Sequence, residues 1–481
     1  MTVYLVGAGP GDPGLLTVRG RALIEACDAL VYDRLVDDRI VALAGEGCER
    51  HYAGKRPGEH SMTQEDINAL LLELGGRHET VVRLKGGDPF IFGRGGEEAL
   101  TLSAAGIPFE VVPGVSSAYA VPAYAGIPVT QRGMAAQVTF VTGHEDPAKP
   151  ESDLDWASLA ATPGTLVFLM GVGALDHNSR RLIEHGMSPD TPAAVISDGT
   201  RPGQRTVVAP LAGIAAAAAG MRPPAITLVG AVAALHERLN WFERRPLHGR
   251  RVVVTRARAQ ASGLAARLEV LGAEVVQAPA IRIEPLPFDP PDLAAYDTVV
   301  VTSANAVDLL LPADVRRLHG VTVAAIGPAT AKALGAYGIV ADVVPAEAVS
   351  EALLEALGEV GGRRVLVATA AGAREVLPDG LRAGGAEVDV VHLYRTMPEA
   401  VNAEALRAAD LVTFTSSSTV SSLAAGLGDA GLHGVRAASI GPVTSAALRE
   451  HGVEPLAEAD PHTVDGLVAA VGRLLAGSQA R

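Results

Sequence analysis

Cysteine is nearly absent from this chain of 481 residues. The two cysteines, Cys27 and Cys48, form no CxxC pair, which excludes a disulfide framework and favours a reducing compartment. We therefore expect structural thiols. His60 and His144 do not share a spacing typical of metal ligands, so no metal site is expected either.

Long basic runs and long apolar runs are also missing. The net charge is −14 and the pI is about 5.4, which argues against a nucleic-acid partner and requires local cations for any anionic substrate. The most membrane-like stretch, which starts at Leu211, is broken by Arg222, Pro223 and Pro224. No cationic segment precedes a signal-like apolar stretch at the N-terminus. We expect a cytoplasmic protein without a membrane partner.

The residues present alternate between β-branched runs, Gly or Pro turns and Ala/Leu-rich helical stretches, the pattern of an α/β protein. The length predicts two to four domains, and 48% hydrophobic residues suffice for sizeable cores. The clearest boundary is the charged stretch NWFERRPLHGRR, after which Arg251 begins a new apolar strand. We place the boundary near Pro246, which predicts domains at 1–245 and 246–481.

The second of these domains contains an internal repeat. The stretch that starts RVVVT at Arg251 returns as RVLVA at Arg364, and DTVVVTSANAV returns as DLVTFTSSSTV, both at an offset of 113 (251 to 364). IGPATAKAL at Ile326 returns as IGPVTSAAL at Ile440, offset by 114 (326 to 440). Two domain-sized copies predict two similar α/β lobes with a cleft between them. Ligands of open α/β sheets bind beyond the carboxyl ends of strands, so the TS and IGPxT turns should face that cleft.

The opening stretch VYLVGAGPGDPGLLT, from Val3, resembles a strand and a glycine turn that hold a dinucleotide. The third glycine of that fingerprint is missing, because Gly9 is followed by Pro10, Gly11 and Asp12. Pro10 has no N–H to donate, and the Asp12 carboxylate would repel a phosphate. A ligand that carries positive charge suits the loop better, although a nicotinamide oxidoreductase stays open as an alternative.

Five further stretches extend the pattern: YDRLV, GKRPGEHSMTQEDIN, KGGDPFIFGRGGEE, VVPGVSSAYAVPAYAGIPVT and LVFLMGV. Together with GAGPGDPGLLT they resemble the S-adenosylmethionine-dependent uroporphyrinogen-III C-methyltransferases of the tetrapyrrole methylase family, over about residues 2–240. The resemblance implies a two-lobed methylase fold, a homodimer, and methylation of uroporphyrinogen III at C2 and C7 to precorrin-2, on the way to siroheme or cobalamin. KGGDPFIFGRGGEE is the most diagnostic of these stretches.

The resemblance also implies the site residues. Asp33 would be the proton acceptor and Lys55 the proton donor, although a turn residue and a solvated charge are the alternatives. Cations near the motif loops, Arg94 among them, would bind the substrate carboxylates; the candidates are Lys55, Arg56, Arg83, Lys85, Arg94 and Arg132. Glycine backbone and a thioether suit a sulfonium, and the implied cofactor contacts are Pro10, Gly86, Gly87, Asp88, Ile91, Ser116, Ser117, Met170, Gly199 and Ala225.

The duplicated half, about residues 250–475, resembles uroporphyrinogen-III synthase through TSANAV, IGPATAKAL, HLYRT, TSSSTV and IGPVTSAAL. The resemblance implies that hydroxymethylbilane loses water and closes with ring D inverted. Tyr394 would protonate the departing hydroxyl, Thr330 and Thr444 would contact the substrate, and backbone N–H groups at Ser303 and Ser416 would bind carboxylates. Helix capping is the alternative for the hydroxyl residues, and we expect it of both threonines in any case.

The predicted fold class is therefore α/β, with a two-lobed methylase fold followed by a pair of flavodoxin-like lobes joined by a crossover. By analogy with the synthases, 250–283 would join 397–475 in one lobe, and 284–396 would form the other. The function predicted is bifunctional, with S-adenosylmethionine as methyl donor. A methyltransferase that carries a non-catalytic tetrapyrrole-binding module is the main alternative.

Overall fold

A computed structural model describes residues 1–54, 62–143, 153–255, 258–278, 281–311, 318–398, 403–428 and 431–476. The chain divides into two compact units. The first holds Met1–Arg251 with Leu268–Glu274, and the second holds Val252–Arg267 and the chain from Val275 onward. Among the described residues, no helix is long and apolar enough to cross a membrane.

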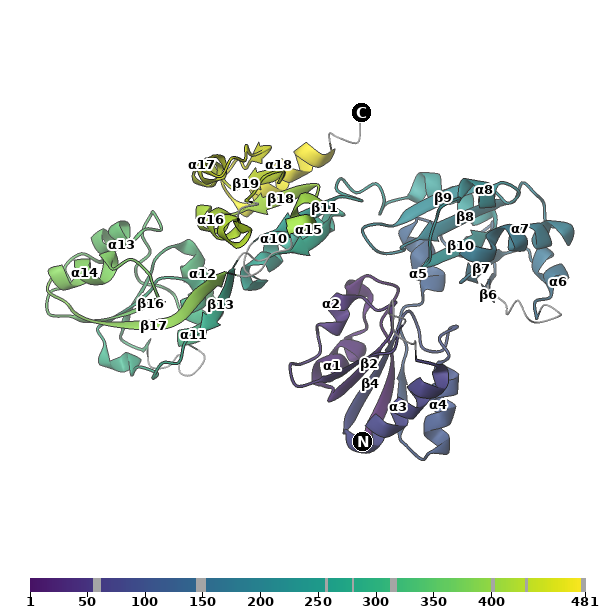
Figure 1. Ribbon diagram of the computed structural model, residues 1–481, viewed down its shortest axis with the longest axis horizontal. Coiled ribbons are helices and arrows are strands. Elements are labelled where there is room, and N and C mark those ends of the chain that lie inside the picture. Colours follow the sequence, from purple (N-terminus) through teal and green to yellow (C-terminus); the bar gives the residue numbers. More distant parts are fainter. Residues whose placement is uncertain are drawn as a thin grey trace. The chain divides into compact units, whose positions relative to one another are not determined.

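The first unit begins with a parallel sheet in the order β3-β2-β4-β1-β5. The strands are β1 (Thr2–Gly7), β2 (Ala29–Tyr32), β3 (Glu49–Tyr52), β4 (Thr80–Lys85) and β5 (Phe109–Val112). The helices are α1 (Val18–Ala26), α2 (Asp38–Val41), α3 (Gln64–Arg77) and α4 (Gly95–Ala104). Figure 1 shows α1 and α2 on one face of the sheet and α3 and α4 on the other. Both faces are therefore covered, which is why β1 and β2 consist mainly of apolar residues.

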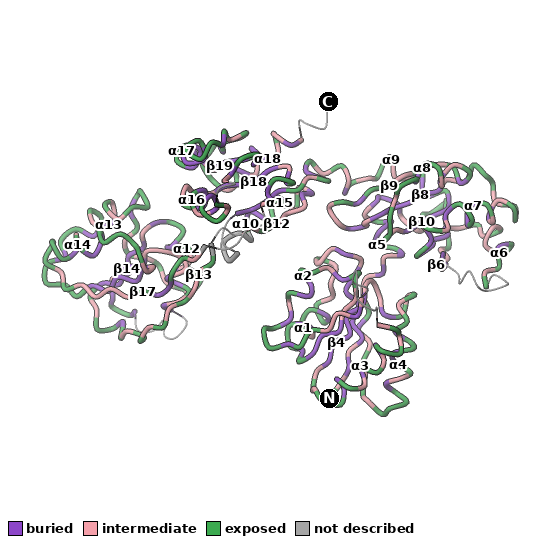
Figure 2. Tube along the Cα trace, viewed as in Figure 1, coloured by how far each residue is buried: buried purple, intermediate pink, exposed green. Residues whose placement is uncertain are grey.

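A second, mixed sheet completes the first unit, in the order β6-β7-β10-β8-β9. Its strands are β6 (Val138–Thr142), β7 (Thr165–Leu169), β8 (Pro192–Ser197), β9 (Arg205–Pro210) and β10 (Ala225–Val229). β10 runs antiparallel to both β7 and β8. The helices are α5 (Ser117–Tyr124), α6 (Trp156–Ala160), α7 (Leu175–Glu184), α8 (Ile214–Ala217) and α9 (His236–Leu239). Buried residues gather along the strands of this sheet, and exposed residues are more frequent along the helices (Figure 2).

The second unit contains two more sheets, in the orders β12-β11-β18-β19-β20 and β13-β17-β16-β14-β15. The third sheet contains β11 (Arg251–Val254), β12 (Glu274–Gln277), β18 (Leu411–Phe414), β19 (Ala437–Ser439) and β20 (Ala457–Glu458). The fourth contains β13 (Ile281–Pro285), β14 (Thr298–Val301), β15 (Thr322–Ala325), β16 (Arg364–Ala370) and β17 (Glu387–Pro398). The helices are α10 (Arg258–Val270), α11 (Ala304–Leu310), α12 (Pro328–Ala336), α13 (Ser350–Leu357), α14 (Val376–Ala383), α15 (Ala403–Arg407), α16 (Ser417–Gly426), α17 (Pro442–Glu450) and α18 (Val464–Ala476).

The third and fourth sheets share one topology. Counted along the chain, the third sheet has the flavodoxin order 2-1-3-4-5. The fourth has the same order from β14 onward, except that β13 takes the fifth place and pairs antiparallel with β17. The two sequence copies have thus exchanged strands, and the chain first crosses between Gln277 and Ile281. The predicted fold class, including the crossover, is confirmed.

Candidate functional sites

A cavity of about 590 Å³ lies in the first unit, where strands from both of its sheets end. β2, β4, β7 and β8 reach it with residues at or just after their carboxyl ends, as expected for an α/β ligand site. All ten residues predicted to contact the cofactor line it: Pro10, Gly86, Gly87, Asp88, Ile91, Ser116, Ser117, Met170, Gly199 and Ala225. Asp33 and Arg94 line it as well.

Glycine is required at this cavity because three backbone segments approach closely. Gly87 and Gly9 exchange backbone hydrogen bonds of 2.7 and 3.2 Å. A Cβ at Gly114 would lie 2.2 Å from the Gly87 carbonyl oxygen, a distance that no side chain tolerates. Asp88 closes the same turn, because its carboxylate accepts hydrogen bonds from the N–H groups of Phe90 (2.8 Å) and Gly114 (3.0 Å). No side chain fits where these three segments meet, so Gly86 and Gly87 present backbone to the cavity. We call this part of the lining the glycine wall.

Asp12 ties the opening loop, which follows β1 of the first sheet, to α5 and to the segment after β8 of the second sheet. Its carboxylate accepts hydrogen bonds from the Tyr124 hydroxyl and the Gly14 N–H, each 2.8 Å long, and its N–H donates to Thr200 Oγ1 at 3.1 Å. Burial, followed by the Asp12 carboxylate, raises the pKa of Tyr124. Asp12 therefore anchors the loop, and Pro10 from the same loop lines the cavity.

Backbone strain is concentrated at this cavity. Five described non-glycine residues have positive φ: Phe92 (50°), Arg94 (56°), Met170 (61°), Asp198 (47°) and Thr200 (68°). The first three line the cavity, and the other two flank the lining residue Gly199. Such conformations persist only where the surrounding structure holds them, and they gather at ligand sites.

Charged side chains form one end of the cavity. Arg83, Lys85 and Glu98 are each no more than 5% exposed. Arg83 Nε lies 3.2 Å and Lys85 Nζ 2.8 Å from Glu98 Oε1, and Arg83 Nη2 lies 3.7 Å from Asp33 Oδ2. Burial, and after it the Arg83 charge, lowers the pKa of Lys85.

The described cations predicted to bind substrate carboxylates are mostly paired with glutamates of the protein itself. Arg83 and Lys85 pair with the buried Glu98, and Arg94 binds Glu97 at 2.7 Å. Arg132 is exposed and does not line the cavity. Lys55, predicted as proton donor, and Arg56 lie outside the described residues.

Sequence reasoning missed Arg34 and Gln64, which also line the cavity. Arg34 follows Asp33 directly in the YDRLV stretch, so the adjacent strand end was the available signal. Gln64 begins α3 and donates to Glu98 Oε1 at 3.3 Å. Nothing in the spacing of the sequence indicated this contact between two helices.

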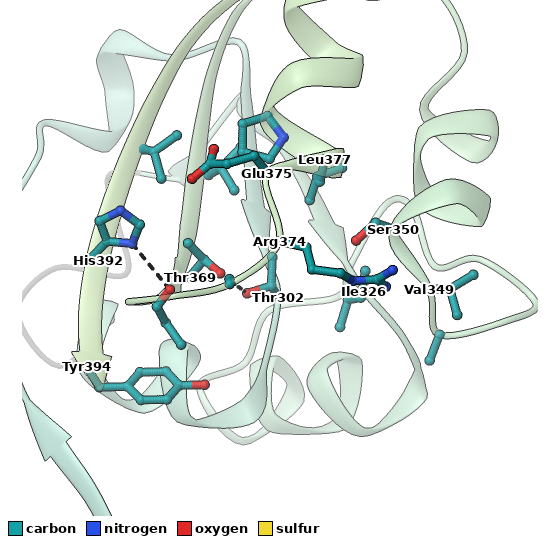
Figure 3. A pocket seen from close by; sticks show the side chains of 16 residues that line it. Thr302, Ile326, Val349, Ser350, Thr369, Arg374, Glu375, Leu377, His392 and Tyr394 are labelled. Carbon is teal, nitrogen blue, oxygen red and sulfur yellow. Dashed lines mark hydrogen bonds between the residues drawn. The ribbon is translucent and has the colours of Figure 1, made fainter. Parts of the chain in front are cut away.

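In the second unit, a cavity of about 270 Å³ opens at the carboxyl ends of β14, β15 and β16, beside the middle of β17 (Figure 3). Tyr394 lines it with Thr302, Thr369, Arg374 and His392. The Tyr394 hydroxyl lies 2.9 Å from Ser303 Oγ. The predicted proton donor and one predicted substrate contact therefore meet here.

A bulge in β17 turns Tyr394 toward Ser303. Thr369 pairs with His392, but the next residue, Ala370, pairs with Tyr394, so one residue of β17 is extra. Successive strand residues normally face opposite sides of a sheet, yet Leu393 and Tyr394 both pack into the core beside α11. Strict alternation would place Tyr394 on the same face of β17 as His392. Because of the bulge, Tyr394 packs instead on the face of Leu393.

The four predicted hydroxyl residues have distinct surroundings, and none lines this cavity. Ser303 and Ser416 cap α11 and α16, accepting from the N–H groups of Ala306 (3.0 Å) and Thr419 (3.2 Å). Thr330 and Thr444 are buried at 3% and 4% exposure and cap nothing. The capping expected of the threonines was wrong, because each helix already begins at the proline that follows Gly327 or Gly441.

Comparison with known proteins accounts for both units. Residues 2–215 match the family model of the Tetrapyrrole (Corrin/Porphyrin) Methylases, and residues 262–469 match that of Uroporphyrinogen-III synthase HemD. The porphyrin biosynthesis protein HemD of Ruminiclostridium josui is 36% identical over 490 residues, which cover 97% of this chain and 96% of that protein.

Two further relatives match the first unit alone. The S-adenosyl-L-methionine-dependent uroporphyrinogen III methyltransferase of Methanosarcina barkeri is 54% identical over 237 residues, 49% of this chain and 93% of that protein. The crystal structure of uroporphyrin-III C-methyl transferase from Thermus thermophilus, complexed with S-adenosyl homocysteine, is 42% identical with a TM-score of 0.43, covering 49% of this chain and 100% of that one.

Proposed function

The chain belongs to the tetrapyrrole biosynthesis family in which a tetrapyrrole methylase is fused to a uroporphyrinogen-III synthase, and from this premise we propose how its residues carry out two consecutive reactions. It is a bifunctional uroporphyrinogen-III synthase and S-adenosylmethionine-dependent uroporphyrinogen-III methyltransferase. The match over 97% of the chain is the observation that carries this function. The methylase match includes the opening glycine loop and removes the nicotinamide interpretation.

The first cavity fits S-adenosylmethionine. Its volume of about 590 Å³ is within the range of small-molecule sites. The glycine wall lets backbone carbonyls approach a sulfonium, and Met170 adds a polarisable thioether. When bound, S-adenosylmethionine supplies the methyl group. We assign the ten predicted lining residues as its binding contacts.

Asp33 is assigned as the proton acceptor of methyl transfer. The methyl–sulfur bond breaks as a carbon–carbon bond forms at C2, and later at C7, of uroporphyrinogen III, so each transfer to a pyrrole carbon releases one proton. Asp33 lies at the end of β2, lines the cavity, and its side chain is 28% exposed. It can therefore reach a substrate and take the proton. Arg94 is assigned to a substrate carboxylate, Lys55 to proton donation, and precorrin-2 is the product.

Tyr394 is assigned as the proton donor of ring closure. The carbon–oxygen bond of the hydroxymethyl group breaks, and the leaving hydroxyl takes a proton from Tyr394 and departs as water. The freed methylene carbon bonds to the α-carbon of ring D that carries the bridge; that bridge bond then breaks and re-forms at the free α-carbon, which loses a proton, so the macrocycle closes with ring D inverted. The bond to Ser303 Oγ holds the Tyr394 hydroxyl at the cavity edge. We also propose four substrate contacts: Ser303, Ser416, Thr330 and Thr444. Among them, Ser303 is supported by its contact with the Tyr394 hydroxyl.

The remaining assignments concern organisation. We place the domain boundary near Pro246, with the synthase lobes formed by about 250–283 with 397–475 and by 284–396.

A homodimer is proposed for the methyltransferase half. Light scattering on the purified chain measures its mass, and a monomer at micromolar concentration would contradict the dimer.

One experiment tests both activities. The purified chain receives hydroxymethylbilane, with and without S-adenosylmethionine, and the products are separated by chromatography and weighed. We expect uroporphyrinogen III without the donor and, with it, a gain of two CH2 masses, because each added methyl group replaces one proton. If only the uninverted isomer forms while supplied uroporphyrinogen III is methylated, the second unit is a binding module.

A further inference from the structure

The central strand of the first sheet carries two cations where apolar side chains belong. Val81, Arg83 and Lys85 share one face of β4, since alternate residues of a strand point the same way. Val81 packs into the apolar core under α3 and α4. Arg83 and Lys85 continue along that face at 3% and 4% exposure.

Stability does not explain this arrangement. Both cations reach a single oxygen, Glu98 Oε1 from α4, and Gln64 from α3 donates to the same atom. Removing charges from water costs more than such pairing usually returns, so an apolar side chain of similar volume would serve the fold as well or better. Buried polar groups that break the apolar pattern in this way are expected near functional sites.

Arg83 connects this buried cluster to Asp33. Its Nε is held by Glu98, its Nη1 donates to the Leu84 carbonyl at 3.3 Å, and its Nη2 lies 3.7 Å from Asp33 Oδ2. The other oxygen of that carboxylate, Oδ1, accepts a hydrogen bond of 3.2 Å from the Leu35 N–H. Asp33 is thus approached on both oxygens, by backbone on one side and by Arg83 on the other.

We propose that Arg83 is a positioning residue for methyl transfer, which holds the Asp33 carboxylate in the orientation that receives the substrate proton. Glu98 holds the guanidinium through Nε, and Gln64 and Lys85 in turn hold the Glu98 carboxylate by donating to the same oxygen. Arg83 itself need not touch the substrate. The inference rests on the proposed role of Asp33 as proton acceptor.

Arg83→Ala tests this role through kcat. Because a misplaced catalytic group can cost about 100-fold in rate, we expect roughly that loss in the single-turnover rate of the first methylation. The Kd for S-adenosylmethionine, measured by calorimetry, should change less than about threefold, since the glycine wall stays intact. Glu98 keeps Lys85 as its partner in this variant, so no unpaired buried charge is created.

Two additions separate positioning from folding. Guanidinium chloride at non-denaturing millimolar concentration should restore part of the Arg83→Ala rate, and Arg83→Lys should retain more activity than Arg83→Ala. Arg77→Ala is the matched control, because Arg77 pairs with Glu49 at the surface, away from the cavity. Thermal unfolding of every variant shows whether the unit is folded.

The outcomes distinguish the two claims. A folded Arg83→Ala variant with a methylation rate within threefold of wild type would overturn the positioning role. The role is equally overturned if the rate falls but neither guanidinium nor lysine restores any of it. Asp33→Asn is run in parallel: if it keeps its rate, the proposed role of Asp33 fails, whatever Arg83 does.

Discussion

The two units bind related tetrapyrroles with sites of different build. The first cavity is lined by backbone from several strand ends, and every described non-glycine residue with positive φ lines it or flanks a lining residue. Its charged end is a buried ion cluster. The second cavity is smaller, has no such strained residue among its described residues, and is lined by hydroxyl groups of Thr302, Ser350, Thr369 and Tyr394 together with charged and apolar side chains.

With the cavities assigned as proposed, the difference fits the two reactions. Methyl transfer requires a carbon, a methyl group and a sulfur in line, and strain held by a rigid wall provides that alignment in advance. Ring closure requires a linear substrate to fold into one conformer, and a correctly placed proton donor suffices for the bond that breaks. The first site would therefore fix the alignment of the reacting atoms, and the second would select one folded conformer of the substrate. The following predictions test this contrast.

Asp33→Ala should give the largest effect and should act on one unit only. Loss of a general base lowers the rate by roughly 100- to 10,000-fold, so we expect methylation of supplied uroporphyrinogen III to fall by that factor. Ring closure of hydroxymethylbilane should be unchanged. Both rates are measured on one preparation, and a folded variant that loses both activities would contradict independent sites.

Tyr394→Phe should have the reverse effect. The ring keeps its packing in the core beside α11, but the hydroxyl that contacts Ser303 is lost. We expect about a 100-fold slower formation of uroporphyrinogen III, with the uninverted isomer accumulating as uncatalysed closure overtakes it. Chromatographic isomer ratios measure this. Closure at the wild-type rate would remove Tyr394 from the mechanism.

Gly114→Ala should damage the rigid wall of the first cavity. The added Cβ collides with the Gly87 carbonyl, and overpacking of this kind costs about 1–3 kcal/mol. We expect weaker S-adenosylmethionine binding by calorimetry and a lower Tm of the first unit. Gly76→Ala is the control, because nothing lies within 4 Å of a Cβ there and the site is helical. Equal binding by the two variants would show that this wall is not rigid.

Lys85→Met should give the smallest effect, seen only in the pH dependence of stability. Burial lowers the pKa of Lys85 in the folded protein below the 10.5 of the free side chain, so the unfolded chain binds more protons as the pH approaches 10.5. Wild-type stability should therefore rise relative to Lys85→Met between the lowered pKa and 10.5. Thermal unfolding of both proteins across that range measures the difference. Parallel curves would show that Lys85 is not titrating there.

The resemblance to the methylases supplied the ten residues that line the first cavity, and several of them were also expected at a site because they directly follow apolar strands. Gly86, Gly87 and Asp88 come straight after β4, and strand ends of a parallel sheet meet at one edge. Partners contributed by other elements were not predictable in this way. Glu98, which pairs with both Arg83 and Lys85, reaches them through the packing of α4 on the sheet, and no spacing in the sequence encodes that contact.

The second unit shows what a repeat can and cannot predict. Matched blocks predicted two similar lobes, whereas the exchange of strands between the lobes was predicted only by analogy with the synthases. The β17 bulge is a single extra residue without a marker, so the side of the sheet that Tyr394 faces could not be read from alternation. Thr330 and Thr444 were misjudged because the Gly-Pro pair starts each helix earlier than a threonine cap would.

The exchange of strands also affects how the protein is made. β11, ending at Val254, pairs with β18, which begins at Leu411, so these partners leave the ribosome far apart in time. The strands of the fourth sheet, β13 to β17, are all synthesised in the interval. The fourth sheet can form before β18, β19 and β20 are synthesised. Until then β11 and β12 lack the other strands of the third sheet, and unpaired strand edges are prone to aggregate. Synthesis that stalls before Leu411 would leave an exposed edge in the cell.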